Sequence, residues 1–588
     1  MYTKSILLSL CLTASVAAQA TTPTTPEMAA PQSKKDSIKA KGKSAAELTQ
    51  RYVKYLRQTA TNEVKPITAR QGDHASVTRD STHVEAGQQV DASTIMGGAP
   101  SAQQPPQGGL KPGGNQSMRD KFNKFRKDQT KKFEDFRAEC NKKYANFLRQ
   151  AWEKFNGSDP VPTPQDITPT PPVEAPAPAA IWPFKSRKHK SKQVKSYEPD
   201  KQPAPVAPIK EEVVQNPVWF KFAYCGTEMK VRMDDSHKFT LRDGRDNNRI
   251  ADLWMEWSGP KFNNVLHDCL NLRANYRMCD WAYLMMLKQL GEQFYGKESN
   301  EATFFTAFVY CQSGYKMRFA TNTSGQLRML YATKSIIYNQ SYFTMEGANF
   351  YPLNGQETSL SISTARFDQE SNMDLYMTAE QALAQNRSDL RTIKSRDFGD
   401  LNIKVNTNLN QMAFYDTYPS SYVGGNVMTR WAMYANTPLE AEVKDQIYPT
   451  LKAKLEGKTE HQKVSMLLNL VQTGLEYRYD EDVWGHDRPF FAEESLFYPY
   501  CDCEDRAILF TRLVRDLVGL DALLVYYPGH LASAIHFNEN VTGDYIEIDD
   551  GRKFLVCDPT YIGSWPGQTM PNYKDSNDSA QVILLKRG

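Results

Sequence analysis

The chain has 588 residues, of which 40% are hydrophobic and 24% are charged, and its formal net charge is +3. This nearly balanced charge argues against a dedicated nucleic-acid-binding protein. Beyond the N-terminus, the sequence has no apolar run of about 18 residues, which a membrane-spanning helix needs. Most of the first 216 residues lack the apolar content that offsets the ordering entropy of folding. We therefore expect the globular core in residues 217–588.

Residues 1–20 are typical of a secretory signal peptide. Lys4 supplies the positive charge, an apolar stretch follows, and Ala18-Gln19-Ala20 gives a small-x-small cleavage pattern. Leu10 stands where a lipid anchor on Cys11 requires a small residue, which disfavours such an anchor. We expect an exported protein that is periplasmic, bound to the cell envelope or secreted.

Two segments of different composition follow the signal. Residues 21–115 are rich in Thr, Ser, Gln, Gly and Pro, and we predict that they are disordered. In residues 116–157 aromatic side chains recur every eleven positions, in the series Phe122, Phe133, Tyr144 and Phe155 and the series Phe125, Phe136 and Phe147. Eleven residues make three helical turns, so this spacing predicts one long amphipathic helix with an aromatic stripe.

The sequence leaves two interpretations of the aromatic stripe open. In the first, the helix packs on its own globular domain or, as a coiled coil, on a copy of itself. In the second, residues 117–157 form a basic amphipathic helix that contacts an anionic envelope or membrane surface. Residues 158–216 are predicted to be a Pro-rich linker, and the basic cluster from Lys185 to Lys195 is predicted to be solvated linker charge.

Residues 217–437 are predicted to form an α+β accessory domain. Residues 219–233 alternate around a Cys225-Gly226-Thr227 turn like a β-hairpin, residues 266–295 have a helical pattern, and residues 315–350 are β-rich. The triplet at 267–269, His-Asp-Cys, is interpreted as structural, because adjacent residues on a helix point in different directions. No catalytic motif is found in this domain.

The cysteines indicate neither a disulfide framework nor a metal site. Eight cysteines follow Cys11, which is few for a chain of this length, and one or two disulfide bridges among them remain open. Cys501 and Cys503 are too close together for a zinc knuckle, and no second close pair completes four ligands. We predict no metal site, and the sequence indicates no cofactor.

Residues 438–588 carry a cysteine in a distinctive position. A helical pattern covers residues 460–475, and a second amphipathic helix covers residues 507–517, just after Cys503. The free N–H groups and the dipole of a helix N-terminus favour a thiolate, which predicts a lowered pKa for Cys503. The backbone N–H of Cys503 is also a candidate oxyanion donor.

A histidine and an aspartate follow Cys503 at the boundaries of predicted strands. His530 comes after Gly529 at a strand edge, and a hairpin delivers Asp558. The order Cys, His, Asp supplies a nucleophile, its base and a group that orients the base. Taken singly, Cys503 is also consistent with a packed or disulfide-bonded cysteine, His530 with a turn histidine, and Asp558 with the start of a turn.

These residues resemble the signature of the transglutaminase-like superfamily, papain-like thiol enzymes with a Cys-His-Asp triad. The matching positions are Cys503, Asp505, Ala507, His530 and Asp558-Pro559-Thr560. The block Cys-Asp-Cys-Glu-Asp-Arg at 501–506 is most similar to that of exported Bacteroidetes-type members. The resemblance covers about residues 460–575 and implies an α+β core in which the helix bearing the cysteine packs on an antiparallel sheet.

The sequence departs from this signature in two places. Cys501 stands where the family has glycine, so Cys501 is an alternative nucleophile, and the aromatic residue two positions after the histidine is absent. His536 is an alternative base, because it would shorten the long interval to Asp558. Trp484 and Tyr500 are candidate walls of an oxyanion or acyl pocket.

The resemblance implies a thiol enzyme acting on a protein or peptide substrate. Cys503 would attack a peptide or glutamine carboxamide, and the thioester would be resolved by water or by an amine. The family leans toward a cysteine protease or amidase over a cross-linking acyltransferase. The alternative is a catalytically silent binding or assembly protein of the cell envelope, which the long N-terminal region and the large accessory domain favour.

Overall fold

A computed structural model describes residues 116–163, 171–176, 186–574 and 580–587. The predicted signal peptide (1–20) and the predicted disordered region (21–115) lie outside the described residues. The described part of the chain is a mixed α+β protein, as the sequence predicts. No described helix is both long enough and apolar enough to cross a membrane.

The predicted long helix is present but ends earlier than the aromatic spacing predicts. Helix α4 covers Gln116–Leu148. Phe155 lies instead in strand β1 (Glu153–Asn156), which pairs with β12 (Ser359–Ile362) and places Phe155 opposite Leu360. The prediction of a helix over 116–157 is therefore wrong for its last residues, because strand pairing there replaces the helical periodicity.

Only the C-terminal half of α4 packs on the protein's own core. Its buried face includes Tyr144, whose ring centroid lies 4.5 Å from that of Trp254 on α5 (Asn247–Trp257), and Asn141, which accepts a hydrogen bond of 2.9 Å from the Trp254 indole. The other described aromatic residues of the stripe are exposed: Phe125, Phe133, Phe136 and Phe147. Packing on the protein's own domain therefore accounts for little of the stripe.

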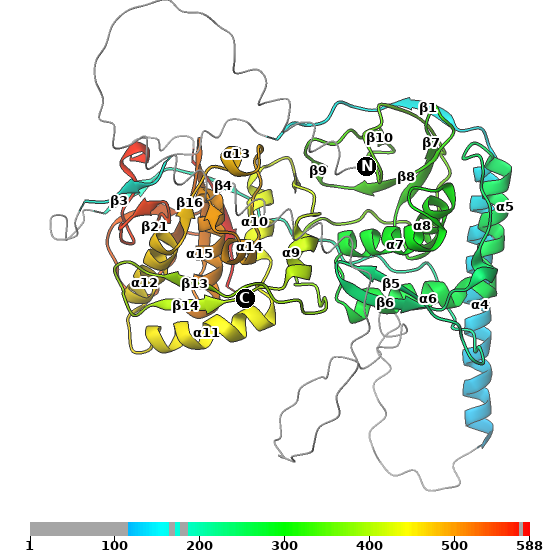
Figure 1. Cartoon of the computed structure of the whole chain (residues 1–588), viewed down its shortest axis with the longest axis horizontal. Coiled ribbons are helices and arrows are strands. Elements are labelled where there is room, and N and C mark those ends of the chain that lie inside the picture. The colour runs from blue at the N-terminus through cyan, green and yellow to red at the C-terminus, as the bar shows by residue number, and fades with distance from the viewer. Residues whose placement is uncertain (1–115, 164–170, 177–185, 575–579, 588) are drawn as a thin grey trace, which may run out of the picture. The chain divides into compact units, whose positions relative to one another are not determined.

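The accessory region is built as the sequence predicts, from a hairpin, a helical layer and a sheet (Figure 1). The hairpin pairs β5 (Phe220–Tyr224) with β6 (Thr227–Val231), and its turn has φ of 41° at Cys225 and 68° at Gly226. The predicted helix over 266–295 is two helices, separated by Arg277 with φ of 48°. The helices are α6 (Asn263–Asn275), α7 (Asp280–Tyr295) and α8 (Asn300–Gln312), after the 3₁₀ turns η2 (Asp235–His237) and η3 (Pro260–Phe262).

The β-rich stretch of this region forms a six-stranded antiparallel sheet in the order β1-β12-β7-β8-β11-β10. Its remaining strands are β7 (Met317–Thr321), β8 (Leu327–Thr333), β10 (Phe343–Met345) and β11 (Ala348–Pro352). Smaller elements follow: β9 (Ile336–Ile337), β13 (Arg391–Lys394), β14 (Asn402–Val405), α9 (Leu409–Tyr415), β15 (Ser421–Tyr422) and α10 (Met428–Asn436). Arg391 on β13 donates hydrogen bonds to the carbonyls of Ser495 and Leu496, so packing continues across the predicted boundary at 437/438.

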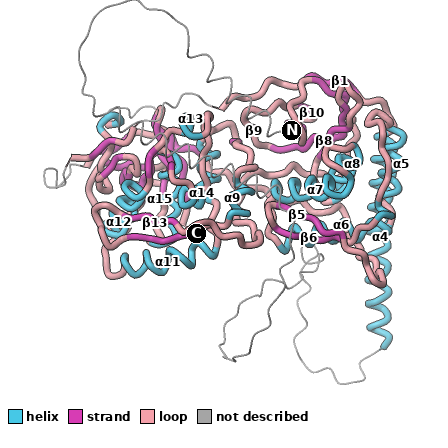
Figure 2. The backbone as a smooth tube through the Cα atoms, in the orientation of Figure 1, coloured by secondary structure: helices cyan, strands magenta, loops and turns pink. Residues whose placement is uncertain are grey.

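The described residues of the C-terminal region form five helices and five strands of a seven-stranded sheet; Figure 2 distinguishes helices from strands by colour. The helices are α11 (Ala441–Leu455), α12 (Glu460–Gly474), α13 (Asp480–Val483), α14 (Ala492–Phe497) and α15 (Cys503–Leu517). The sheet has the order β3-β20-β21-β19-β18-β23-β4, and its five inner strands are antiparallel. These strands are β18 (Ala522–Tyr527), β19 (His530–Ile535), β20 (Asp544–Glu547), β21 (Lys553–Cys557) and β23 (Gln581–Leu585). Helix α15 packs on β18 and β19 and on α12.

Part of the predicted linker belongs to this sheet. Strand β3 (Arg187–His189) pairs in parallel with β20, and β4 (Lys192–Val194) pairs in parallel with β23. Only residues 190–191 separate β3 from β4, so the sheet must curve until its two edges lie near each other. His189 is buried and lies 3.1 Å from the Thr569 hydroxyl. The prediction of a linker is therefore wrong for residues 187–189 and 192–194, whereas the side chains of Lys188, Lys190 and Lys192 are exposed as predicted.

The two-stranded pairings complete the region. Strand β2 (Val173–Glu174), also from the predicted linker, pairs with β22 (Tyr561–Ile562), and β16 (Glu476–Tyr477) pairs in parallel with β17 (Tyr500–Cys501). A last 3₁₀ turn, η4 (Pro571–Tyr573), follows β22. The β16–β17 pair leads directly into α15 and thereby fixes where that helix begins.

Candidate active site

Cys503 is the first residue of α15. The Asp505 carboxylate holds this helix start, because it accepts hydrogen bonds from the N–H of Asp502 at 3.2 Å and the N–H of Phe490 at 2.8 Å. The Cys503 side chain is fully buried, and its thiol donates to Glu504 Oε2 at 3.3 Å. The backbone N–H of Leu531, the residue after His530, lies close enough to the sulfur to lower the pKa of the thiol. The start of β19 therefore reaches the thiol.

The expected lowering of the Cys503 pKa is wrong for this structure. Burial raises the pKa of the thiol well above its usual value, and the charges of Glu504 and Asp502 raise it further, whereas the Leu531 N–H lowers it. The helix N-terminus is outweighed, because the desolvation of a thiolate and two neighbouring carboxylates oppose it. The thiol is held in its protonated form.

His530 and Asp558 form a buried pair. Nε2 of His530 lies 2.8 Å from Oδ2 of Asp558, and both side chains are almost completely buried. A carboxylate partner at Nε2 favours the tautomer that carries its proton on that nitrogen. Nδ1 of His530 is buried and has no hydrogen-bond partner among the described residues. Nδ1 of the ring is therefore free to accept a proton, and His530 directly precedes Leu531, whose N–H lies near the Cys503 sulfur.

Two tyrosine rings stack behind the imidazole. The Tyr573 ring lies 5.1 Å from that of His530 with an interplanar angle of 13°, and the Tyr527 ring lies 4.8 Å from that of Tyr573. Tyr527 is the last residue of β18 and Tyr573 the last residue of η4, so these two elements hold the stacked rings against the imidazole and restrict its rotation. Such packing positions a base as firmly as its hydrogen bond does.

The loop that carries Asp558 is held by α12 and α15. The Asp558 carboxylate accepts a hydrogen bond of 2.9 Å from the N–H of Thr560. The Gln472 amide of α12 donates to the carbonyls of Asp558 at 3.1 Å and Tyr561 at 2.8 Å. Arg506 of α15 donates to the Pro559 carbonyl at 3.3 Å. The helix that carries the cysteine thus also anchors the aspartate loop.

A cluster of buried carboxyl groups surrounds the cysteine. Ligand atoms of Asp480, Asp487 and Glu504 all lie within 4.8 Å of one another, as do those of Asp502, Cys503 and Glu504. One oxygen of Asp502 and one of Glu504 are buried without a hydrogen-bond partner in the described part of the chain. Burial and mutual repulsion raise the pKa values of Asp480, Asp502 and Glu504. Carboxylate oxygens grouped in this way are the ligands that a hard divalent cation prefers. The expectation of no metal site rested on the spacing of the cysteines, which could not reveal a site of this kind.

A pocket of about 220 Å³ lies beside this cluster. Asp487 lines it, and the buried Arg430 guanidinium pairs with Asp487. Asp487 belongs both to the pocket wall and to the carboxyl group that includes Glu504, so it connects the pocket with the cluster beside Cys503. The other lining residues come from the predicted linker, the accessory region and the C-terminal region: Thr163, Tyr338, Asn339, Tyr415, Asp416, Tyr418, Ser420, Tyr434, His486, Arg488, Pro489 and Glu494.

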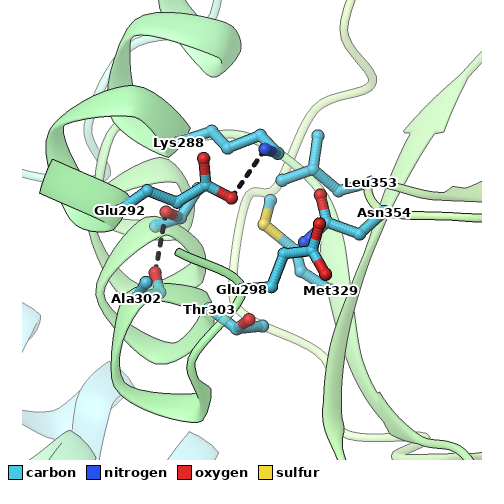
Figure 3. Close-up of a pocket in the computed structure, with 9 residues that line it drawn as sticks. Lys288, Glu292, Glu298, Ala302, Thr303, Met329, Leu353 and Asn354 are labelled. Atoms are coloured by element: carbon cyan, nitrogen blue, oxygen red, sulfur yellow. Dashed lines mark hydrogen bonds and ion pairs between the residues drawn. The ribbon is translucent and has the colours of Figure 1, made fainter. Parts of the chain in front are cut away.

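A second cavity, between α7, α8 and β8, is far smaller. Its volume is about 10 Å³, enough for one water molecule. The ion pair of Lys288 and Glu292, with 2.7 Å between Nζ and Oε1, lies along its wall (Figure 3). Lys288, Thr303 and Thr306 line this cavity, which is too small for an organic ligand.

The alternative catalytic residues lie away from the His530–Asp558 pair. The Cys501 sulfur contacts the Glu476 carbonyl at 3.8 Å, and Arg506 lowers the Cys501 pKa against the larger effect of burial. His536 is at the opposite end of β19 from His530, where its Nδ1 lies 2.8 Å from the Lys553 carbonyl oxygen. Neither Cys501 nor His536 therefore makes its described contact with the His530–Asp558 pair.

The two candidate pocket walls stack on arginines. The Trp484 ring lies 4.4 Å from the Arg488 guanidinium, and the Tyr500 ring lies 5.3 Å from that of Arg478. Their role as pocket walls stays a prediction. Tyr477 and Tyr479 also lie close to Cys503, and burial is the main reason that the pKa of each hydroxyl is raised. No local sequence pattern points to these two residues, because their proximity depends on the β16–β17 pairing.

All eight described cysteines are free thiols, so none of the disulfide pairs left open by the sequence is formed. Comparison with known proteins identifies no matching family, no similar characterised protein and no similar solved structure. The site must therefore be interpreted from its own geometry.

Proposed function

We propose that this chain is an exported thiol enzyme that hydrolyses or transfers acyl groups of peptide or glutamine amides through a Cys503 thioester. The observation that carries the proposal is the buried His530–Asp558 pair, with 2.8 Å between Nε2 and Oδ2, whose free Nδ1 lies next to the strand position that contacts the thiol. We further propose that α15 and the antiparallel strands form a transglutaminase-like core, as the residues at 501–507, 530 and 558–560 suggest.

In the proposed mechanism His530 is the base and Asp558 orients it. Nδ1 takes the Cys503 proton, and the thiolate attacks the amide carbonyl carbon to give a tetrahedral oxyanion. The C–N bond then breaks as His530 returns the proton to the leaving amine, which leaves a thioester. Water or an amine, deprotonated by the same nitrogen, attacks the thioester and regenerates the thiol. Asp558 stabilises the imidazolium at each step.

Substrate access requires the wall between the pocket and the thiol to move. Cys503 has no exposed surface, and Glu504 accepts its proton in a hydrogen bond of 3.3 Å. A substrate in the 220 Å³ pocket would displace Glu504 and the Arg430–Asp487 pair before it reached the sulfur. Loss of the Glu504 contact lowers the thiol pKa and makes proton transfer to His530 easier.

The second candidate function is a catalytically silent binding or assembly protein of the cell envelope. The closed site favours it, because a fully buried thiol held protonated by carboxylates cannot react in this conformation. The two candidates differ in whether His530 controls the chemistry of Cys503.

The test is the iodoacetamide alkylation rate of Cys503 in the mature chain between pH 6 and 9, resolved by peptide mapping. We expect His530→Ala to lower the rate at neutral pH by about tenfold or more, because the variant lacks the group that accepts the thiol proton. His536→Ala, on the same strand, is the matched control, and the buried Cys269 is the internal reference. Equal Cys503 rates in the unsubstituted chain and in His530→Ala would rule out the enzyme and leave the binding protein.

A further inference from the structure

Among the described residues, the N-terminal half of α4 contacts the rest of the chain through the exposed ion pair of Glu134 with Lys210, at 3.7 Å, and buries no side chain there. None of its described side chains between Asp120 and Phe136 is buried, and the first buried residue of the helix is Arg137. Figure 1 shows this half of α4 running free of the other labelled helices. A helical segment this short is marginal in water by itself, and an exposed aromatic face adds a further cost.

The exposed aromatic side chains share one face of this segment. Phe125, Phe133 and Phe136 are 59%, 46% and 39% exposed, and Gln129 lies between them at helical spacing. This face is adjacent to the one that Tyr144 buries against the accessory core, so it continues past the folded region as an open stripe. A stripe with an eleven-residue repeat is typical of helices that pair lengthwise.

Charged residues of alternating sign line the flank of the stripe that faces away from the accessory core. In chain order they are Lys121, Asp128, Lys132 and Glu139, all exposed. A helix that lies on an anionic membrane has a uniformly basic polar face, whereas two acidic side chains interrupt this flank. The pattern fits a partner that presents the same charges in reverse order.

We propose that α4 pairs antiparallel with α4 of a second copy of this chain, around a two-fold axis near Gln129. In this pairing Phe125 faces Phe133 of the second copy. Antiparallel helices bring like flanks together, so Lys121 faces Glu139 and Asp128 faces Lys132 across the axis. In a parallel pair, the charged flank would instead meet the other flank of the stripe in the second copy. That other flank is the side of α4 that the accessory core covers further along the helix, around Tyr144.

The pairing is independent of the chemistry at Cys503. It buries the aromatic stripe and supplies the packing that residues 120–136 lack within one chain. Each contact occurs twice because of the two-fold axis.

The first test is sedimentation velocity of the mature chain over a concentration series. We expect a dimer, and we expect Phe125→Ser with Phe133→Ser to raise its dissociation constant at least about 100-fold, because four buried aromatic side chains are lost. Phe147→Ser is the matched control, since Phe147 is 47% exposed on the same helix but lies outside the paired segment. Both variants alter exposed side chains, so their circular dichroism and melting temperature should match those of the unsubstituted chain.

The second test is disulfide cross-linking of single cysteines introduced on α4, with the unsubstituted chain as background. Gln129→Cys should cross-link two copies, Phe133→Cys should not, and Lys124→Cys on the opposite face should not. Cross-linking of both Gln129→Cys and Phe133→Cys would show a parallel pair and overturn the proposal. A monomer at all concentrations would also overturn it, whether or not that monomer binds phosphatidylglycerol vesicles.

Discussion

Buried charges are arranged differently in the accessory region and around Cys503. In the accessory region several of them occur in pairs of opposite sign. Arg318 makes two hydrogen bonds to Glu370, at 2.7 and 2.8 Å, and one to Glu346 at 2.9 Å, and Arg232 holds Asp268 at 2.6 Å. Around Cys503 the carboxyl groups instead lie against one another and are driven toward their protonated forms.

This difference distinguishes a neutralised cluster from the carboxyl cluster at the proposed site. The His-Asp-Cys triplet at 267–269 has the residue types of a thiol site, but Arg232 neutralises Asp268, and the Cys269 sulfur is simply buried. Asp502 and Glu504, the two residues that flank Cys503, form no ion pair with a described arginine. The proximity of their two carboxyl groups lowers the stability of the folded state. Carboxyl groups that destabilise one another beside a cysteine and a His–Asp pair support the proposal that Cys503 is the functional residue.

The largest expected effect tests the accessory side of the comparison. Arg318→Leu leaves Glu346 and Glu370 without their shared partner, so we expect it to destabilise the protein by about 3–5 kcal/mol. Urea unfolding followed by tryptophan fluorescence measures this loss. The triple variant Arg318→Leu, Glu346→Gln and Glu370→Gln removes the charges as well and should recover part of it. A loss below about 1 kcal/mol for Arg318→Leu alone would mean that these pairs do not stabilise the accessory region.

The next effect is a pH dependence that belongs to the C-terminal region. Burial and Glu440 raise the pKa of Glu493 to about 8, and burial raises that of Glu494 to about 7. The folded state then binds protons that the unfolded state releases above about pH 4.5, so stability falls as the pH rises through 7 to 8. We expect Glu493→Gln to reduce this fall between pH 6 and 8 by roughly 1–2 kcal/mol, measured by urea unfolding at each pH.

The control for this pH dependence is Glu228→Gln, because Glu228 is an exposed residue of the accessory hairpin. It should leave the pH profile unchanged. A profile that is equally steep in Glu493→Gln and in the unsubstituted chain would show that the Glu493 carboxyl is not protonated in the folded state.

Much of the C-terminal fold could be predicted from the sequence. The expected helix over 460–475 differs from α12 by one residue, and the expected strand edge at His530 is the start of β19. Apolar periodicity and glycine stops determine these elements locally. Strands β3 and β4 could not be predicted, because they are short and basic and are held by backbone pairing to distant edges. The end of α4 was missed because β1 pairs with a strand about 200 residues away.

The candidate site was predictable only where its residues stand at element boundaries. His530 begins β19 and Asp558 follows β21, and the structure brings their side chains together. Asp480, Asp487 and Arg430 could not be found in this way, because α13, a loop and α10 meet Glu504 only in the folded chain. The local argument about the helix N-terminus also failed for the Cys503 pKa, since burial and these carboxyl groups act from outside the helix.

A smaller effect tests the carboxyl cluster itself. Glu504→Gln removes one charge and the acceptor of the Cys503 thiol. We expect it to stabilise the protein by about 1 kcal/mol, because like charges are relieved, and to speed Cys503 alkylation at pH 7 by about tenfold, because the thiol pKa falls. Asp505→Asn is not an equivalent change, since Asp505 caps α15 and should lower stability. Slower alkylation of Glu504→Gln would contradict the assigned role of Glu504.

The smallest expected effect concerns exposed charge pairs, for which we expect no difference between the two regions. Lys188 pairs with Glu547 at the edge of the C-terminal sheet, and Lys221 pairs with Glu228 in the accessory hairpin, at 2.7 and 2.9 Å. Both lysines are more than half exposed, so water screens the two pairs alike. We expect Lys188→Gln and Lys221→Gln to leave the urea midpoint unchanged within error. A clear loss for Lys188→Gln alone would show that regional context, and not burial, decides what a charge pair contributes.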